Sequence, residues 1–229
     1  MKHFKRFLRQ AAIIAGKDLA IELSTGEIVT TSGFFAVLVA VIASLAFHAG
    51  QTAAQSVAPG VIWVAVAFAS VLAIGRSWQR EREESALAGL LVLPLSRGAL
   101  FAGKAISIAF FVWSVELVVV PVTALLFAVD LVETSLGLVL ISLAATPGIA
   151  AVGTLFGAMT VRTRARDLVL ASVFFPLLAP TLLAAVAGTR ELFGGAPLDE
   201  LFDYIAIMGV FGVVFTAGGI GLFDTLIDG

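Results

Sequence analysis

The sequence predicts an all-α polytopic integral membrane protein, and three observations lead to that fold class. The chain of 229 residues is 60% hydrophobic and 13% charged, with a mean hydropathy of +1.07. Several stretches reach the roughly 20 apolar residues that a helix needs to cross a bilayer. The Lys and Arg residues cluster in every second connection between those stretches. Because backbone groups in lipid have no water to bond, each stretch is expected to be a helix.

Six transmembrane helices are predicted along the chain. Ionised residues are absent from them apart from Lys104, at the edge of the third, and Glu116, deep inside it. An even number of spans places both chain ends on the same side of the membrane. The predicted spans are residues 31–49, 57–75, 104–129, 136–161, 168–187 and 204–223.

The positive charges predict which side that is. Thirteen of the 14 Lys and Arg residues lie in the N-terminal segment or in the connections after the second and fourth spans, and Arg190 alone lies opposite. Cytoplasmic loops carry the excess of Lys and Arg, so both termini are expected in the cytoplasm and the chain in the cytoplasmic (inner) membrane. The opposite side carries the acids Asp130, Glu133, Glu191, Asp199, Glu200 and Asp203.

The chain is expected to form one transmembrane domain over 1–229, with spans in 31–223 and a cytoplasmic loop at 76–98. Residues 1–30 are expected to form an amphipathic helix in the membrane interface, because apolar residues recur on one helical face and cations fall largely elsewhere. A simple anchor and a lever between a cytoplasmic partner and the first span remain alternative interpretations. The apolar face consists of Phe4, Phe7, Leu8, Ala11, Ala15 and Leu19.

The cytoplasmic loop contains the densest charge cluster in the chain, at 80–84, where all five residues are ionised. Leu87, Leu90 and Leu91 follow at helical spacing, and Pro94 ends the pattern. A short amphipathic helix is therefore predicted, with acids at its N-terminus, where the helix dipole favours them. Such a helix can be pushed by another protein. The alternative is a solvated charge run beside a surface-bound helix.

The composition also excludes several kinds of chemistry. Without cysteine the chain has no disulfide, thiolate metal site or thiol catalysis. Residues 98–104 match the spacing of a phosphate-binding P-loop, but Ala105 stands where Ser or Thr should bind Mg²⁺, and no strand precedes it. We therefore expect no ATPase site, no catalytic residue and no metal site. Energy for any transport would come from a partner or an ion gradient.

An ordered set of short motifs resembles the haem exporter B (CcmB) family of cytochrome c maturation. Lys104 opens the third span in the same pattern, and the resemblance covers residues 18–187. Ser85 and Ala88 depart from the Gly and the second acid that the family's loop often carries. The motifs are Ala58-Pro59-Gly60-Val61-Ile62-Trp63, Leu93-Pro94-Leu95-Ser96, Thr146-Pro147 with Gly153, Arg162-Thr163-Arg164, and the prolines Pro176 and Pro180.

This resemblance implies the permease subunit of an ABC transporter, paired as a homodimer with two cytoplasmic ATPase subunits that bind the ATP. It further implies haem-handling membrane proteins and a haem chaperone as partners, besides the lipid bilayer, and no nucleic acid. Haem would be a substrate and not a resident cofactor. ATP hydrolysis would drive haem export or release of a haem-loaded chaperone. The loop helix would enter a cleft on the ATPase through Glu81, Glu83, Glu84, Leu87, Leu90 and Leu91.

Polar residues in or near the spans are candidates for a substrate path. A charge at the depth of Glu116 costs about 2.5–3.5 kcal/mol on insertion scales. Glu116 is therefore interpreted either as part of a substrate or proton path or as a protonated carboxyl that bonds a neighbouring helix. His48 is either a haem ligand or a polar helix end. The candidate path comprises Glu116, Trp113, Trp63 and His48.

Three other functions stay open at this point. One is an ABC permease for another substrate, such as a drug or a lipid-linked sugar. A second is an intramembrane enzyme that uses Glu116 and His48, which would need more polar residues at depth than this chain carries. The third is a passive scaffold for haem proteins.

Overall fold

The computed structural model describes residues 2–47, 51–83, 95–160 and 166–228, and within these ranges every regular element is helical. Six long apolar helices are able to cross a membrane by length and composition, which confirms the predicted all-α polytopic fold. The helices are α1 (Lys2–Thr25), α2 (Glu27–Ala46), α3 (Gln51–Glu83), α5 (Arg97–Leu126), α6 (Leu131–Thr160), α7 (Arg166–Phe193) and α8 (Phe202–Asp228), with a short 3-10 turn η1 (Leu198–Leu201) before α8.

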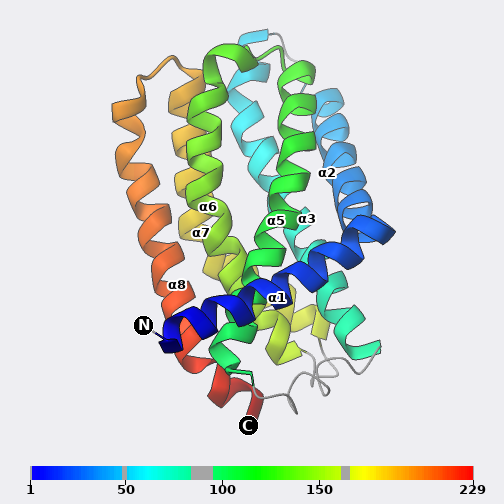
Figure 1. The fold of residues 1–229 in the computed structure, drawn as a ribbon. Helices are drawn as coiled ribbons and strands as arrows, with labels where there is room; N and C mark the ends of the chain where they lie inside the picture. The colour runs from blue at the N-terminus through cyan, green and yellow to red at the C-terminus, as the bar shows by residue number, and fades with distance from the viewer. Residues whose placement is uncertain (1, 48–50, 84–94, 161–165, 229) are drawn as a thin grey trace.

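The six long helices stand side by side as a bundle, and α1 crosses the bundle near the end where the C-terminus lies (Figure 1). The helix α6 packs against α3, α5, α7 and α8, and α5 packs against α2, α3, α6 and α8, so these two helices form the centre of the bundle. The helix α8 is the most exposed of the six, with 17% of its span buried in the chain. Both α1 and the end of α8 lie at the same end of the bundle, as an even number of spans requires.

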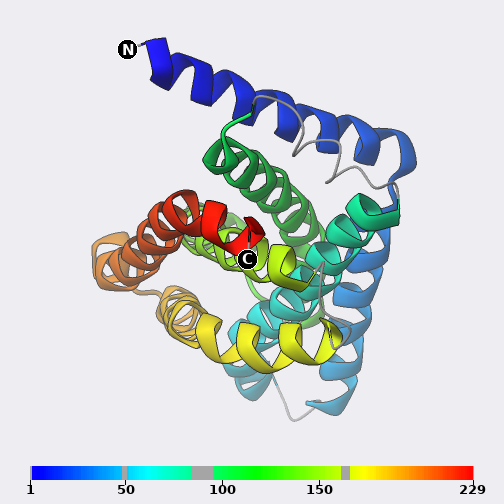
Figure 2. The same ribbon diagram turned by 90° about the horizontal axis from the view of Figure 1, so that it is seen from below.

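The helix α1 is separated from the first span by one residue, Gly26. Gly26 has φ 63°, in the left-handed region that favours glycine, and this turn lets α1 lie across the bundle while α2 runs along it. Ala11, Ile14 and Ala15 are buried against the bundle, whereas Phe4 is 65% exposed. The N-terminal end of α1 lies apart from the rest of the bundle (Figure 2), and part of the predicted apolar face is accordingly exposed, including Leu8 at 49%.

Close helix packing depends on small residues at two places. On α6, Gly153 and Gly157 face α3, where an added Cβ would lie 2.2 Å from atoms of Ile74 and Trp78 respectively. On α5, a Cβ at Gly103 would lie 2.7 Å from the carbonyl oxygen of Ala11 on α1. The GxxxG pattern of α6 therefore serves packing inside this chain.

Several helices extend beyond the predicted spans, most of all at the end of α3. The helix that contains the second predicted span does not end near residue 75, because α3 continues without a break to Glu83. Residues 76–83 are Arg, Ser, Trp, Gln and Glu, which include no helix breaker and several good helix formers. Glu81 and Glu83 consequently lie at the C-terminal end of α3 and not at the N-terminus of a separate helix.

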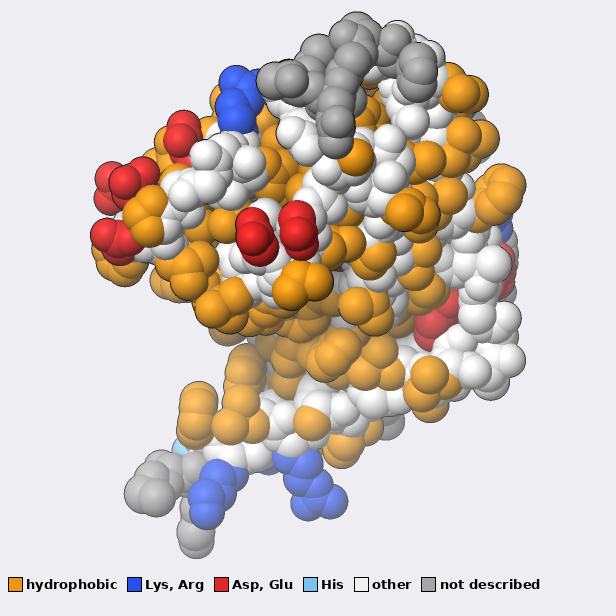
Figure 3. Space-filling model, turned by 90° about the horizontal axis from the view of Figure 1, so that it is seen from above, with side chains coloured by type: hydrophobic (Ala, Val, Ile, Leu, Met, Phe, Trp, Pro, Cys, Tyr) orange, Lys and Arg blue, Asp and Glu red, His pale blue; other side chains and the backbone are white. Residues whose placement is uncertain are grey.

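Charge separates strongly between the two ends of the bundle. The view from above shows acidic side chains at the end opposite α1, and Lys and Arg on α1 below (Figure 3). Lys5, Arg6 and Arg9 are exposed on α1. The exposed acids at the opposite end are Asp130, Glu133, Glu191, Asp199, Glu200 and Asp203.

Candidate functional site

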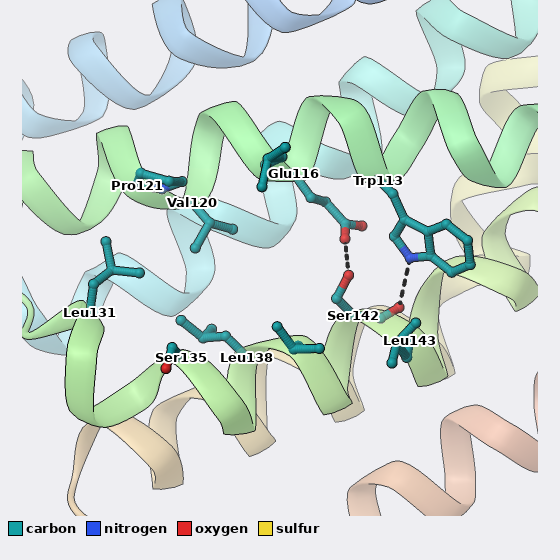
Figure 4. A pocket seen from close by; sticks show the side chains of 11 residues that line it. Trp113, Glu116, Val120, Pro121, Leu131, Ser135, Leu138, Ser142 and Leu143 are labelled. Carbon is teal, nitrogen blue, oxygen red and sulfur yellow. Dashed lines mark hydrogen bonds between the residues drawn. The ribbon is translucent and has the colours of Figure 1, made fainter. Parts of the chain in front are cut away.

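Glu116 lies in the middle of the bundle, 4% exposed, and its carboxylate points from α5 toward α6 (Figure 4). The Thr146 hydroxyl donates a hydrogen bond to Oε1 of Glu116 at 2.7 Å, and the Ser142 hydroxyl donates one to Oε2. Ser142 and Thr146 are one turn apart on α6, so both face the same carboxylate. The Trp113 indole N–H donates to the Ser142 carbonyl oxygen at 3.5 Å. These contacts hold the carboxylate at a fixed position between two helices.

A groove of about 330 Å³ leads away from Glu116 between α5 and α6. It reaches Leu131, the first residue of α6, and opens on the bundle surface beside Leu117, which is 77% exposed. Among its described lining residues Glu116 is the titratable one, and most of the others are apolar. The lining residues are Trp113, Glu116, Leu117, Val120, Pro121, Leu131, Ser135, Leu138, Val139, Ser142 and Leu143.

Both helices that form this groove contain a proline within an otherwise continuous helix. Pro121 in α5 and Pro147 in α6 have no backbone N–H, so the carbonyl groups of Leu117 and Leu143 lose their usual helical donors. Leu117 and Leu143 both line the groove. The groove therefore lies where each helix is locally weakened. It can hold a long apolar molecule with one polar end near the carboxylate.

The structure describes three of the four residues predicted for the substrate path, and these three do not form one site. Glu116 and Trp113 share the groove, as expected from their spacing of one helical turn. Trp63 lies on α3, 3% exposed, and its indole N–H donates to the Thr189 hydroxyl on α7 at 2.8 Å, so it joins two other helices. His48 lies outside the described residues.

A second polar site lies at the end of the bundle crossed by α1, and its centre is Lys104. The Lys104 side chain is 1% exposed, and its ammonium group pairs with Asp18 at 2.8 Å and with Glu81. Lys17 also pairs with Glu81, at 2.7 Å. The Ser107 hydroxyl donates to Asp18 at 3.1 Å. Buried charges thus connect three helices, α1, α3 and α5.

A separate group of ion pairs joins α3 to Glu22 of α1 and Glu27 of α2. Arg80 lies 3.6 Å from carboxylate oxygens of both Glu22 and Glu27, and Arg76 lies 3.2 Å from Glu27. Glu22 also accepts a hydrogen bond from the Val29 N–H at 2.8 Å. We call the first group the ionic cluster, and its members are Lys17, Asp18, Glu81 and Lys104.

The cluster keeps Lys17 charged. Burial lowers the pKa of the Lys17 ammonium group, but the hydrogen bond to Glu81 and the charge of Asp18 outweigh it, and the pKa is raised overall. Because the Lys17 pKa is raised in the folded state, the charged ammonium group stabilises that state, fully so at pH values below the ordinary lysine pKa of 10.5. That stabilisation is lost as pH rises through the raised pKa, so it is fully present at neutral pH.

The ionic cluster changes the interpretation of the residues that were predicted to contact an ATPase. Glu81 was expected to be an acid offered to a partner protein, but it is 4% exposed and paired with two lysines. The sequence pattern could not show this, because Lys17 and Lys104 are far away along the chain. Glu83 is the last residue of α3. Glu84, Leu87, Leu90 and Leu91 lie outside the described residues, so their predicted role is untested.

Two signals in the sequence could have revealed the cluster. Asp18 and Glu22 lie one turn apart on the α1 face that also carries the buried Ala11, Ile14 and Ala15. Acids on the otherwise apolar face of a helix indicate cationic partners. In the same way, a Lys inside an apolar span, such as Lys104, indicates acidic partners.

A comparison with protein families covers the part of the chain that contains the groove and the ionic cluster. A family model described as CcmB protein matches residues 9–218. The chain belongs to the CcmB family. This match confirms the resemblance seen in the sequence, and both the groove and the ionic cluster lie inside the matched range. The CcmB family indicates a haem-export permease of cytochrome c maturation, and this chain is accordingly a multi-pass membrane protein of the permease type. No curated protein matches the chain.

Proposed function

We propose that this CcmB-family chain is the permease subunit of an ABC-type complex for cytochrome c biogenesis in the inner membrane. A separate cytoplasmic ATPase subunit binds and hydrolyses ATP, and the permease couples that hydrolysis to haem export or to release of a haem-loaded chaperone. The observation that carries the proposal is the family match over nearly the whole chain. The complex contains two copies of this chain, its ATPase, haem-handling membrane proteins and the chaperone.

The contacts of the helices on either side of the connection at 84–94 support this function. The end of α3 is held to α1 by the pair between Glu81 and Lys17. The start of α5 is held to α1 as well, because the Ser96 backbone N–H and hydroxyl both donate to Oε1 of Gln10 at 3.3 Å. Both ends of the connection at 84–94 are thus attached to α1. A force on that connection acts on α1, which favours the lever interpretation over a simple anchor.

The groove supports the substrate side of the proposal. An amphipathic substrate in the membrane needs an apolar path with a polar contact, and the groove supplies both through Trp113 and Glu116. We place these two residues in the substrate path. Among the described residues, the partners that the Glu116 carboxylate bonds are Ser142 and Thr146, neither of which supports a rival enzyme that uses Glu116 with His48.

The docking role of the coupling loop can be tested by truncating its leucines. Buried apolar anchors at interfaces typically cost about 2 kcal/mol or more when truncated, or roughly 30-fold in affinity. Leu87→Ala with Leu91→Ala is expected to detach the ATPase from the solubilised complex, as measured by the co-purified ratio. Glu83→Ala alone should weaken binding modestly and in a salt-dependent way. Leu125→Ala, at a residue 83% exposed on the bundle surface, is the control. Co-purification of the double variant at wild-type ratio would show that the loop is not the docking element.

The substrate class can be tested in a strain that lacks this chain. Restoring the wild-type chain should restore cytochrome c production. A permease for a drug or a lipid-linked sugar would leave cytochrome c production unchanged by deletion, and that result would contradict the proposed function.

A further inference from the structure

The ionic cluster lies at the only described junction where α1, α3 and α5 are joined by buried charges. Glu81 is two residues before the end of α3, so the cluster directly precedes the connection at 84–94. Lys104 is on α5, the helix that carries Glu116 twelve residues later. At 1.5 Å per residue, about 18 Å of continuous helix separates the cluster from the groove. The cluster therefore lies between the proposed ATPase contact and the proposed substrate path.

The contact between α1 and α5 is too close for the two helices to slide freely. Gly103 approaches α1 so closely that a Cβ there would lie 2.7 Å from the Ala11 carbonyl oxygen and from Ile14 Cβ. The pair between Lys104 and Asp18 lies one residue further along α5. A movement of α1 must consequently either move α5 with it or break a buried ion pair.

Buried ion pairs are a costly way to hold helices together. Taking each charge out of water costs several kcal/mol, and replacing a whole buried pair by apolar residues is often neutral or stabilising. Stability alone therefore does not explain why charges occupy this junction. What an ion pair adds over apolar packing is direction, because the ammonium group must stay within bonding distance of particular oxygens.

The cluster also contains polar atoms for a second arrangement. Glu81 Oε2 and Trp78 Nε1 are both buried and have no hydrogen-bond partner among the described residues. They lie one turn apart on α3, and the Lys104 ammonium group is 5.6 Å from the centre of the Trp78 ring. Glu81 Oε2 is an unused acceptor for the ammonium group, and the Trp78 N–H can donate to a carboxylate that the ammonium group releases, so the bonds can rearrange without leaving every group unpaired.

We propose that the ionic cluster is a joint that transmits movement of the C-terminal end of α3 to the groove at Glu116, with Lys104 as its positioning residue. Lys104 receives the movement from α3 through Glu81 and from α1 through Asp18. It passes the movement along α5 to the carboxylate that Ser142 and Thr146 hold. This inference rests on the proposed function and assigns to the cluster a role other than static attachment.

The test removes the joint while keeping the charge balanced. Lys104→Met with Glu81→Gln deletes one cation and one anion and leaves Lys17 beside Asp18, 3.2 Å away on α1. Because no unpaired charge stays buried, the complex is expected to assemble with its ATPase at wild-type ratio and to hydrolyse ATP within twofold of the wild-type rate. Cytochrome c production in cells should fall at least tenfold. Hydrolysis would then be uncoupled from function.

The matched control is Arg76→Gln with Glu27→Gln. It also removes one cation and the anion paired with it, but these side chains are 46% and 51% exposed, so all three measurements should stay within twofold of wild type. Cytochrome c production within twofold of wild type in the test variant would overturn the joint. Loss of the ATPase or of the folded complex in parallel with production would overturn it too, because it would show a purely structural attachment. Failure of the proposed function would give a different result, because the deletion strain would then produce the same amount of cytochrome c with and without the wild-type chain.

Discussion

Glu116 and Lys104 lie on the same apolar helix, and each finds its partners on other helices. Lys104 pairs with carboxylates of α1 and α3, whereas Glu116 accepts hydrogen bonds from two hydroxyl groups of α6. The difference matters because Lys104 has its charge neutralised within the chain and Glu116 has no cation among its described contacts. Glu116 therefore keeps the capacity to bind a donor or a cation that enters the groove.

Glu116→Gln tests that capacity. Glutamine keeps the shape and a hydrogen-bonding end, so the complex should assemble at wild-type ratio. If the carboxylate contacts the substrate or carries protons, cytochrome c production should fall at least tenfold. Ser114→Ala is the control, since the Ser114 hydroxyl bonds only its own helix, at the Phe110 carbonyl oxygen, among the contacts described. Full activity of the Gln variant would remove Glu116 from the mechanism and leave it a packing residue.

At the scale of helices, close approach depends on residues without a side chain. The glycines of α6 let α3 pack with Trp78 fully buried, and Gly103 lets α1 reach α5. These contacts determine where the ionic cluster can form, because Asp18 reaches Lys104 only if α1 lies directly against α5. The close contact of α1 with α5 thus brings Asp18 to Lys104, and the ion pair in turn holds the two helices together.

A graded series of alanine substitutions tests this packing. Gly157→Ala places a Cβ 2.2 Å from the rigid ring of Trp78 and should destabilise the chain by about 1–3 kcal/mol. Gly153→Ala should cost less, because its Cβ meets the flexible end of Ile74. Gly209→Ala, with nothing within 4 Å, should be neutral or slightly stabilising, since Ala is the better helix former. Apparent melting temperatures in detergent should follow this order. Equal values for the three variants would show that α6 and α3 are less tightly packed than described.

At the scale of the whole molecule, the charges divide the bundle into a cationic and an acidic end. The acidic end carries Arg190 as its single Lys or Arg, whereas α1 and the connections at the other end carry thirteen. That division favours cytoplasmic termini by the positive-inside rule. The end with α1 and the ionic cluster would then face the proposed ATPase, and the acidic end would face the periplasm.

Cysteine labelling tests the orientation cleanly, because the native chain has no cysteine. Single cysteines in 130–135 and 190–203 should react with an impermeant thiol reagent added from outside. Cysteines in 80–97 should react only after the membrane is permeabilised. External labelling within 80–97 would reverse the orientation and remove the docking proposal with it.

The sequence predicted the features that follow from composition and local pattern. The six apolar helices able to span a membrane and a separate N-terminal helix are confirmed, since apolar length and periodicity determine both, whereas the place of the N-terminal helix in the membrane interface stays a prediction. The pairing of Glu116 with α6 and the buried position of Glu81 could not be predicted, because each depends on which helices become neighbours. The end of α3 was placed too early, since hydropathy reports where lipid ends and not where a helix does.

Synthesis of the chain proceeds from the N-terminus, so Asp18 and Glu22 emerge long before Lys104. Until α5 has entered the membrane, Asp18 has its neighbour Lys17 but lacks the buried Lys104 ammonium group that attaches it to the bundle. The seating of α1 on the bundle is therefore a late event in biogenesis, completed only after the third span is in place. A chain that stalls before α5 would leave this acidic face of α1 uncovered, and such a chain is distinguishable from a finished one by the exposure of its first helix to protease.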